Sequence, residues 1–244
     1  MNPFIYTFIA GFATMIGVIP ILFNIKQINK FICLSLSFAS GVMFMISIID
    51  LIPESLILLS SKYQGFIIIL LCLIFVFLGI IISMIIDYYI DSKQLNNKLY
   101  KVGIISMLVI ILHNIPEGIA TFIAGSTNQT LALSLTIAIA LHNIPEGISI
   151  AIPIYYSTKS KLKAILYTFI SSISEPLGAL IAYIFLKNIN TNIFLGLLFS
   201  LIAGIMIQIS ICQLLPTSKS YNYKAITYMF FIIGVLFVLL KFLF

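Results

Sequence analysis

Long apolar stretches alternate with short polar connections along nearly the whole chain. Each stretch is close to the roughly 20 residues that an α-helix needs to cross the hydrocarbon core of a bilayer. The connections are too short for a separate soluble domain, so we expect one transmembrane domain over residues 1–244. The pattern predicts eight spanning helices, at residues 3–23, 31–52, 65–86, 102–124, 131–154, 164–186, 193–215 and 225–244.

The composition is that of a chain whose solvent is the bilayer. Hydrophobic residues make up 61% of the 244 positions, charged residues make up 8%, and the mean hydropathy is +1.20. These values lie far outside what a water-soluble domain could expose. Backbone groups inside lipid must bond within the protein, which for segments of this length means helices rather than a barrel. We therefore predict an all-α, polytopic membrane protein.

The positive charges indicate the orientation. All 13 basic residues are lysines, and most lie in the odd-numbered connections. Because cytoplasmic loops are enriched in lysine, these connections are predicted to be cytoplasmic and both termini to face outward. The net charge of +6 is spread thinly over loops with no basic run, so no nucleic-acid partner is indicated.

An internal repeat is the most informative feature of the sequence. Leu-His-Asn-Ile-Pro-Glu-Gly-Ile occurs at residues 112–119 and again, unchanged, at residues 141–148. The two copies contain the only histidines of the chain, His113 and His142. Each copy lies mid-span in successive predicted helices, so the two run antiparallel, in an inverted arrangement around the membrane midplane.

The rise of a helix gives the depth of each side chain. Both imidazoles lie about 21–22 Å from the middle of the outer connection, so they share a depth. Glu117 and Glu146 lie about one turn to either side, roughly 13 Å apart along straight helices. Pro116 and Pro145 each remove a helical hydrogen bond, and the resulting kinks can turn both carboxylates inward.

The side chains of the repeat are suited to binding a metal ion. Within each copy the His and Glu share a helix face, and the Asn can add an amide oxygen. Imidazole nitrogen with carboxylate and amide oxygen suits zinc, iron, manganese, cobalt or nickel better than calcium, magnesium or copper(I). The alternative is that these residues only join two helices by hydrogen bonds. The candidate ligands are His113, Asn114, Glu117, His142, Asn143 and Glu146.

Two further residues are candidate ligands at the same depth in the membrane. Glu175, in Ser-Ser-Ile-Ser-Glu-Pro at 171–176, is a third intramembrane acid. An ionisable residue at the bilayer centre costs about 3 kcal/mol and is by default a functional hypothesis. Met43 lies mid-span on the second predicted helix and could add a thioether, although an ordinary core position is the more common role of a lone methionine.

The remaining acids lie toward the predicted helix ends. Asp50 and Glu54 are expected near the outer end of the second helix and are candidates for a metal entrance. Asp87 and Asp91 are expected at the inner end of the third helix and are candidates for a metal exit. The alternative for each of the four is an ordinary solvated helix end.

With these motifs the sequence resembles the ZIP (Zrt-, Irt-like) metal transporters, and most of all their bacterial zinc-transporting branch. The resemblance implies metal uptake into the cytoplasm, a binuclear site, and movement of one helix bundle against another. It implies one metal site from His113, Glu117, His142 and Glu146 with Met43. It implies a neighbouring site from Asn114, Asn143 and Glu175, which shares Glu117 and Glu146. Asp50 resembles an outer entrance acid.

The sequence departs from that family in two places. The connection between Asp91 and Lys101 lacks the histidines that many relatives place there, which argues against a metal-sensing role for this loop. The segment Ser-Ile-Cys-Gln-Leu-Leu-Pro at 210–216 has Cys212 and Gln213 where relatives commonly have acids. A weaker or different exit site is the implied consequence.

We therefore predict transport of zinc, with iron, manganese, cobalt, nickel or cadmium as further candidates, into a bacterial cell across its cytoplasmic membrane. The alternatives are an intramembrane zinc-dependent hydrolase and a metal sensor. No His-Glu-x-x-His motif is present and both histidines are already candidate ligands, so we expect no enzyme and no cofactor. The expected partners are the metal ion and the lipid bilayer, with a homodimer left as an open alternative.

Overall fold

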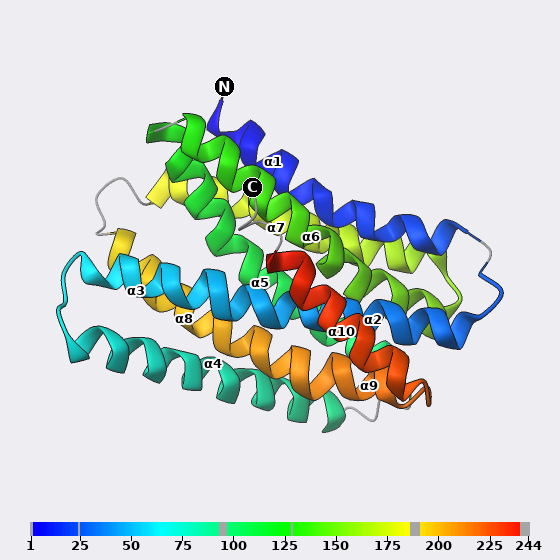
Figure 1. Ribbon diagram of the computed structural model, residues 1–244. Coiled ribbons are helices and arrows are strands. Elements are labelled where there is room, and N and C mark those ends of the chain that lie inside the picture. The colour runs from blue at the N-terminus through cyan, green and yellow to red at the C-terminus, as the bar shows by residue number, and fades with distance from the viewer. Residues whose placement is uncertain (1, 24, 93–96, 128, 186–190, 240–244) are drawn as a thin grey trace. The chain divides into compact units, whose positions relative to one another are not determined.

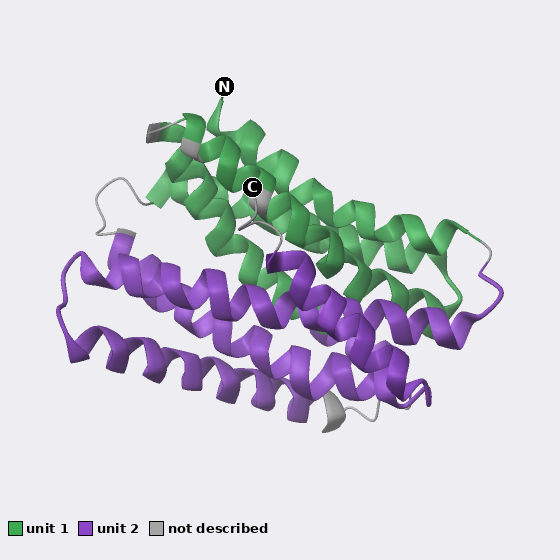
Figure 2. Ribbon diagram, viewed as in Figure 1, with its two compact units in different colours: residues 1–24, 106–189 green, residues 25–105, 190–244 purple. Residues whose placement is uncertain are grey.

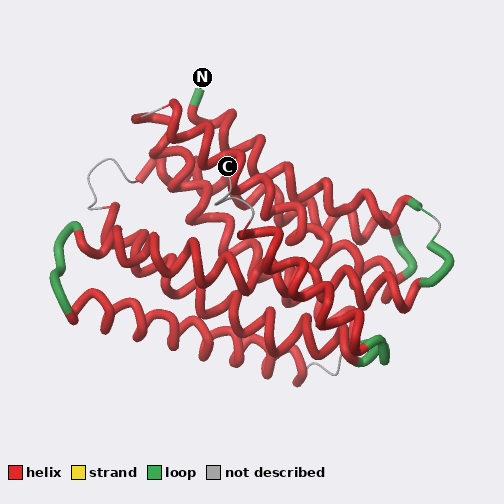
Figure 3. Tube along the Cα trace, in the orientation of Figure 1, coloured by secondary structure: helices red, strands yellow, loops and turns green. Residues whose placement is uncertain are grey.

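Every regular element in the described part of the chain is helical, as Figure 3 shows. The computed structural model describes residues 2–23, 25–92, 97–127, 129–185 and 191–239. The predicted all-α class is confirmed.

The helices follow one another along the chain with short connections (Figure 1). Three of the helices change their hydrogen-bonding type without ending. A 3₁₀ segment, η1, continues α1. The π-helical turn η2 links α2 to α3, and the π-helical turn η4 links α8 to α9. The elements are α1 (Pro3–Ala13), η1 (Thr14–Leu22), α2 (Ile28–Ile46), η2 (Ser47–Leu51), α3 (Ile52–Ser60), α4 (Phe66–Ser92), α5 (Lys98–Thr127), α6 (Gln129–Thr158), α7 (Lys161–Phe185), α8 (Thr191–Ile209), η4 (Ser210–Leu214), α9 (Leu215–Lys219) and α10 (Lys224–Leu239).

The number of membrane spans agrees with the sequence pattern. Within the described residues, seven helical segments are long and apolar enough to cross a bilayer, and α10 is a shorter apolar helix. The predicted eighth span continues into residues 240–244, which lie outside the described residues. The second span differs from the prediction, because the helix continues through Asp50 and Glu54 to Ser60. Pro53 comes just after the π-helical turn η2, where the hydrogen-bond register of the helix changes, and the helix continues through it.

The chain forms two compact units, coloured separately in Figure 2. Unit 1 consists of Met1–Asn24 and Ser106–Ile189, and so holds α1, η1, most of α5, and α6 and α7. Unit 2 consists of Ile25–Ile105 and Asn190–Phe244. The eight-residue motif repeat lies entirely in unit 1.

Glycines let the helices of unit 1 cross with backbone against backbone. A Cβ on Gly118 of α5 would overlap the carbonyl oxygen of Glu175 on α7. A Cβ on Gly147 of α6 would overlap the carbonyl oxygen of Thr14 in η1. Both glycines belong to the repeated motif, and small residues at crossings are what close helix packing in lipid requires. The motif therefore fixes the packing of unit 1 as well as its polar side chains.

Unit 2 is built from two similar halves. Gly41 of α2 packs against the carbonyl of Phe231 on α10, and Gly204 of α8 packs in the same way against Val76 on α4. Each half also has a buried pair of serine hydroxyls that joins two helices. Ser37 and Ser218 join α2 to α9, and Ser55 and Ser200 join α3 to α8.

The sequence of unit 2 carries this relation as well. Residues 47–53 read Ser-Ile-Ile-Asp-Leu-Ile-Pro and residues 210–216 read Ser-Ile-Cys-Gln-Leu-Leu-Pro. In both segments the first five residues form the π-helical turn. Such turns are rare and occur often at functional positions. The pattern gives unit 2 an internal inverted repeat in which Gln213 corresponds to Asp50.

Candidate metal centre

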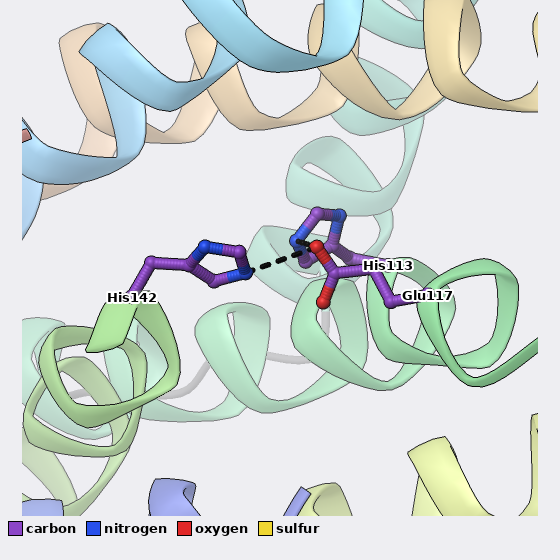
Figure 4. Close-up of side chains that lie close together, drawn as sticks. All are labelled: His113, Glu117 and His142. Atoms are coloured by element: carbon purple, nitrogen blue, oxygen red, sulfur yellow. Dashed lines mark hydrogen bonds and ion pairs between the residues drawn. The ribbon is translucent and has the colours of Figure 1, made fainter. Parts of the chain in front are cut away.

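One carboxylate oxygen lies between the two imidazoles of unit 1, as Figure 4 shows. Glu117 Oε1 is 3.1 Å from His113 Nε2 on the same helix and 3.0 Å from His142 Nε2 on α6. Ligand atoms of the three residues all lie within 4.8 Å of one another. His113 and Glu117 are buried and His142 is nearly so. This spacing fits a single metal ion placed among the three side chains.

The second glutamate of the repeat reaches the same place. Glu146 Oε1 is 3.4 Å from His113 Nε2, and the Glu146 side chain is fully buried. Both carboxylates therefore approach one imidazole, although straight helices would separate them by roughly 13 Å along the axis. Each helix is continuous through its motif proline, Pro116 or Pro145.

Glu175 joins the cluster through Asn143. The Asn143 amide donates to Glu175 Oε2 at 2.9 Å and to the carbonyl oxygen of Ala10 at 2.9 Å. Asn143 and Glu175 have no exposed surface. The sixth predicted helix thus brings its acid to the motif helices, and α1 contributes a backbone oxygen to the same arrangement.

Many polar atoms of the cluster lack a hydrogen-bond partner among the described residues. Buried polar groups are otherwise satisfied in the great majority of cases, so each exception needs an explanation. Buried carboxylates also need a compensating charge. Coordination of a divalent cation satisfies both needs. Apart from the atoms of the His–Glu contacts above, the atoms without a partner are Nδ1 of His113, both amide atoms of Asn114, Oε2 of Glu117, Oδ1 of Asn143, Oε2 of Glu146 and Oε1 of Glu175.

The other predicted residues belong to unit 2. Met43 is buried on α2, Asp50 lies half-buried on η2, and Glu54 is exposed on α3. Asp91 lies on the last turn of α4, and its side chain is outside the described part of the structure. The metal-binding, entrance and exit roles of these residues stay predictions.

Asp87 has partners that the sequence did not reveal. Its carboxylate forms an ion pair with Lys101 and accepts a hydrogen bond from the Gln213 amide. The ion pair is only partly exposed, at 11% for the lysine side chain and 23% for the aspartate. Because a lysine already balances its charge, Asp87 joins α4, the start of α5 and η4, and its predicted exit role must compete with this contact.

Comparison with known proteins identifies close relatives. The family described as ZIP Zinc transporter matches residues 90–241. A protein of Clostridium perfringens named Zinc transporter ZupT is 38% identical, with 90% of this chain and 87% of the relative covered. Proteins of the same name from Streptococcus mutans and Chlorobaculum parvum are 40% and 38% identical, each with 90% of this chain and 88% of the relative covered.

Proposed function

We propose, from the premise that this chain belongs to the ZIP zinc transporter family, that the transported zinc ion binds in the buried cluster of unit 1. The chain is a multi-pass membrane protein and a transporter rather than an enzyme. The observation that supports the proposed site best is the single carboxylate oxygen of Glu117 placed about equally far from two buried imidazoles.

The chemistry of the cluster suits zinc. Two imidazole nitrogens and a carboxylate oxygen are ligands that zinc takes in tetrahedral sites, and Glu146 is in reach as a fourth. The ligands must remove water from the ion and still release it, so a mixture of imidazole, carboxylate and amide groups favours passage over permanent retention.

A second ion beside the first is part of the proposal. Asn114, Asn143 and Glu175 supply oxygen atoms next to the shared carboxylates Glu117 and Glu146. Three buried carboxylates carry more negative charge than one divalent cation neutralises, which supports a binuclear site. Iron, manganese, cobalt, nickel and cadmium fit the same ligand types and remain candidates as further substrates.

We also infer inward transport across a bacterial cytoplasmic membrane, because lysines mark the cytoplasmic connections and the relatives are bacterial proteins. All of the motif ligands lie in unit 1. This division supports a mechanism in which unit 1 carries the ion as a body, within one transmembrane domain of residues 1–244. A homodimer remains compatible with this mechanism.

Uptake of zinc by vesicles that contain the purified protein tests the proposed function. The variant Glu117→Ala plus Glu146→Ala should abolish saturable uptake, because it removes both carboxylates from the imidazoles. Ser126→Ala is a matched control on the same helix, since its exposed hydroxyl donates to the carbonyl of Phe122 on that helix. Zinc that binds the native protein but never enters the vesicles, with or without a pH gradient, would contradict transport and reopen the hydrolase and sensor alternatives.

A further inference from the structure

The two motif helices of unit 1 have matching neighbours. Gly118 of the first motif contacts the carbonyl of Glu175, and Gly147 of the second motif contacts the carbonyl of Thr14. Three residues beyond each carbonyl a glycine follows, Gly178 or Gly17, and each packs against the backbone of the same motif helix. Thr14 and Glu175 therefore occupy equivalent positions in the two halves of the inverted repeat.

The side chains around these two positions differ in charge. On one flank Glu175 accepts a hydrogen bond from Asn143. Asn114 is the residue of the first motif that corresponds to Asn143. By the same symmetry, Thr14 corresponds to Glu175 and is therefore the expected neighbour of Asn114. Asn114 and Thr14 are both fully buried, and neither side chain has a hydrogen-bond partner among the residues that the structure describes. One flank of the site is thus anionic and bonded, while the other is neutral and unpartnered.

Thr14 also marks a change in the backbone. The helix turns from α to 3₁₀ at this residue, and the Thr14 N–H bonds to Gly11 O rather than to Ala10 O. The Ala10 carbonyl, one turn earlier, accepts the Asn143 amide. A 3₁₀ stretch within a longer helix often marks a functional hinge. The first spanning helix therefore contributes the Ala10 carbonyl to the anionic flank and the Thr14 hydroxyl to the neutral flank.

Two buried polar side chains without partners are costly, so their presence needs a ligand to explain it. A hydroxyl and an amide oxygen are hard, uncharged ligands that bind a divalent cation or its water weakly. The shared carboxylates of Glu117 and Glu146 lie in the same unit and can accompany the ion. The chemistry points to a low-affinity position for the transported cation.

We propose that Thr14 and Asn114 form a neutral oxygen subsite from which the cation leaves toward the cytoplasm. This inference rests on the proposed function. Gly118, beside Glu175, lies about 7.5 Å outward from the level of His113, whereas Gly147, beside Thr14, lies about as far inward from the level of His142. An ion that moves inward passes from the anionic flank to the neutral one. Release requires that the last binding position be weak.

Three variants of Thr14 separate this role from a structural one. Thr14→Val keeps the shape and removes the hydroxyl, and it should lower kcat for zinc uptake at least about fivefold, the worth of roughly one hydrogen bond, while KM changes little. Thr14→Ser keeps the hydroxyl and should behave like the native protein. Thr14→Asp makes the second flank anionic, so it should bind zinc more tightly in a dye competition titration and turn over more slowly.

The melting temperature of the metal-free protein serves as the folding control. Because the Thr14 hydroxyl has no partner in the described structure, Thr14→Val should melt at the native temperature or above it. Native kcat in Thr14→Val together with native zinc affinity in Thr14→Asp would overturn the inference. If the native protein takes up no zinc, the proposed function itself has failed. If the native protein takes up zinc and Thr14→Val does so with the native kcat, only this inference has failed.

Discussion

Replacing Glu117 by Gln tests how the central carboxylate contributes to zinc affinity. Its Oε1 contacts two buried imidazole nitrogens, at 3.0 and 3.1 Å, so an ion held by both imidazoles also lies beside this oxygen. Gln keeps the shape and one oxygen but removes the charge. The effect therefore reports electrostatics rather than packing.

The expected loss follows from the charge on this ligand. Interactions with an ionised partner contribute about 1.5–3 kcal/mol and are about twice as strong as neutral ones. A neutral oxygen beside the bound ion in place of the ionised one should therefore cost at least about 1 kcal/mol, which corresponds to a rise in the zinc Kd of at least about fivefold. The rise should be present at low and high salt alike, because buried charges are screened little.

Competition between the purified protein and a fluorescent zinc chelator in detergent measures this Kd directly. Ser126→Ala on the same helix should leave the value unchanged, since its exposed hydroxyl donates to the Phe122 carbonyl on α5. A Glu117→Gln protein that folds and binds zinc as tightly as the native protein would refute the reasoning, and zinc would then have to be held elsewhere.

Three further outcomes are expected. Zinc binding should weaken as pH falls, because the imidazole ligands must be deprotonated to bind a metal, and a flat profile in isothermal titration at several pH values would contradict this. Gly118→Ala should lower the melting temperature by several degrees and slow uptake, because the added methyl overlaps the Glu175 carbonyl; an unchanged melt would contradict the close crossing of α5 and α7. In a double-mutant cycle, the variant Lys101→Met plus Asp87→Asn should lose about 1 kcal/mol less stability in chemical denaturation than the sum of the two single losses, whereas additive losses would mean that the ion pair contributes nothing.

The sequence predicted the parts of the structure that depend on local chemistry. Spans of apolar residues are evident in any window, because lipid requires continuous hydrophobic helices. The repeat at residues 112–119 and 141–148 also carries its own geometry, since identical segments in antiparallel helices present identical ligands to each other. The resemblance to the family added the residues of the neighbouring site.

The features that the sequence did not predict depend on contacts between distant elements. The second helix continues to Ser60 although its hydropathy falls near Glu54, and Pro53 lies just after the π-helical turn η2 inside this continuous helix. The ion pair of Asp87 with Lys101 joins two helices that the linear pattern treats as separate. In the sequence, Thr14 is an ordinary small residue in an apolar segment. Its contact with Gly147 shows that it occupies the position equivalent to that of Glu175.

X-ray absorption at the zinc edge, on the purified protein loaded with one equivalent of zinc, tests most directly whether the repeated motif holds the ion. We expect a shell of nitrogen and oxygen at about 2.0–2.2 Å with the scattering signature of two imidazoles. One imidazole should be lost in His142→Ala. A shell dominated by sulfur at about 2.3 Å, or an imidazole signal that His142→Ala leaves unchanged, would contradict the proposed site.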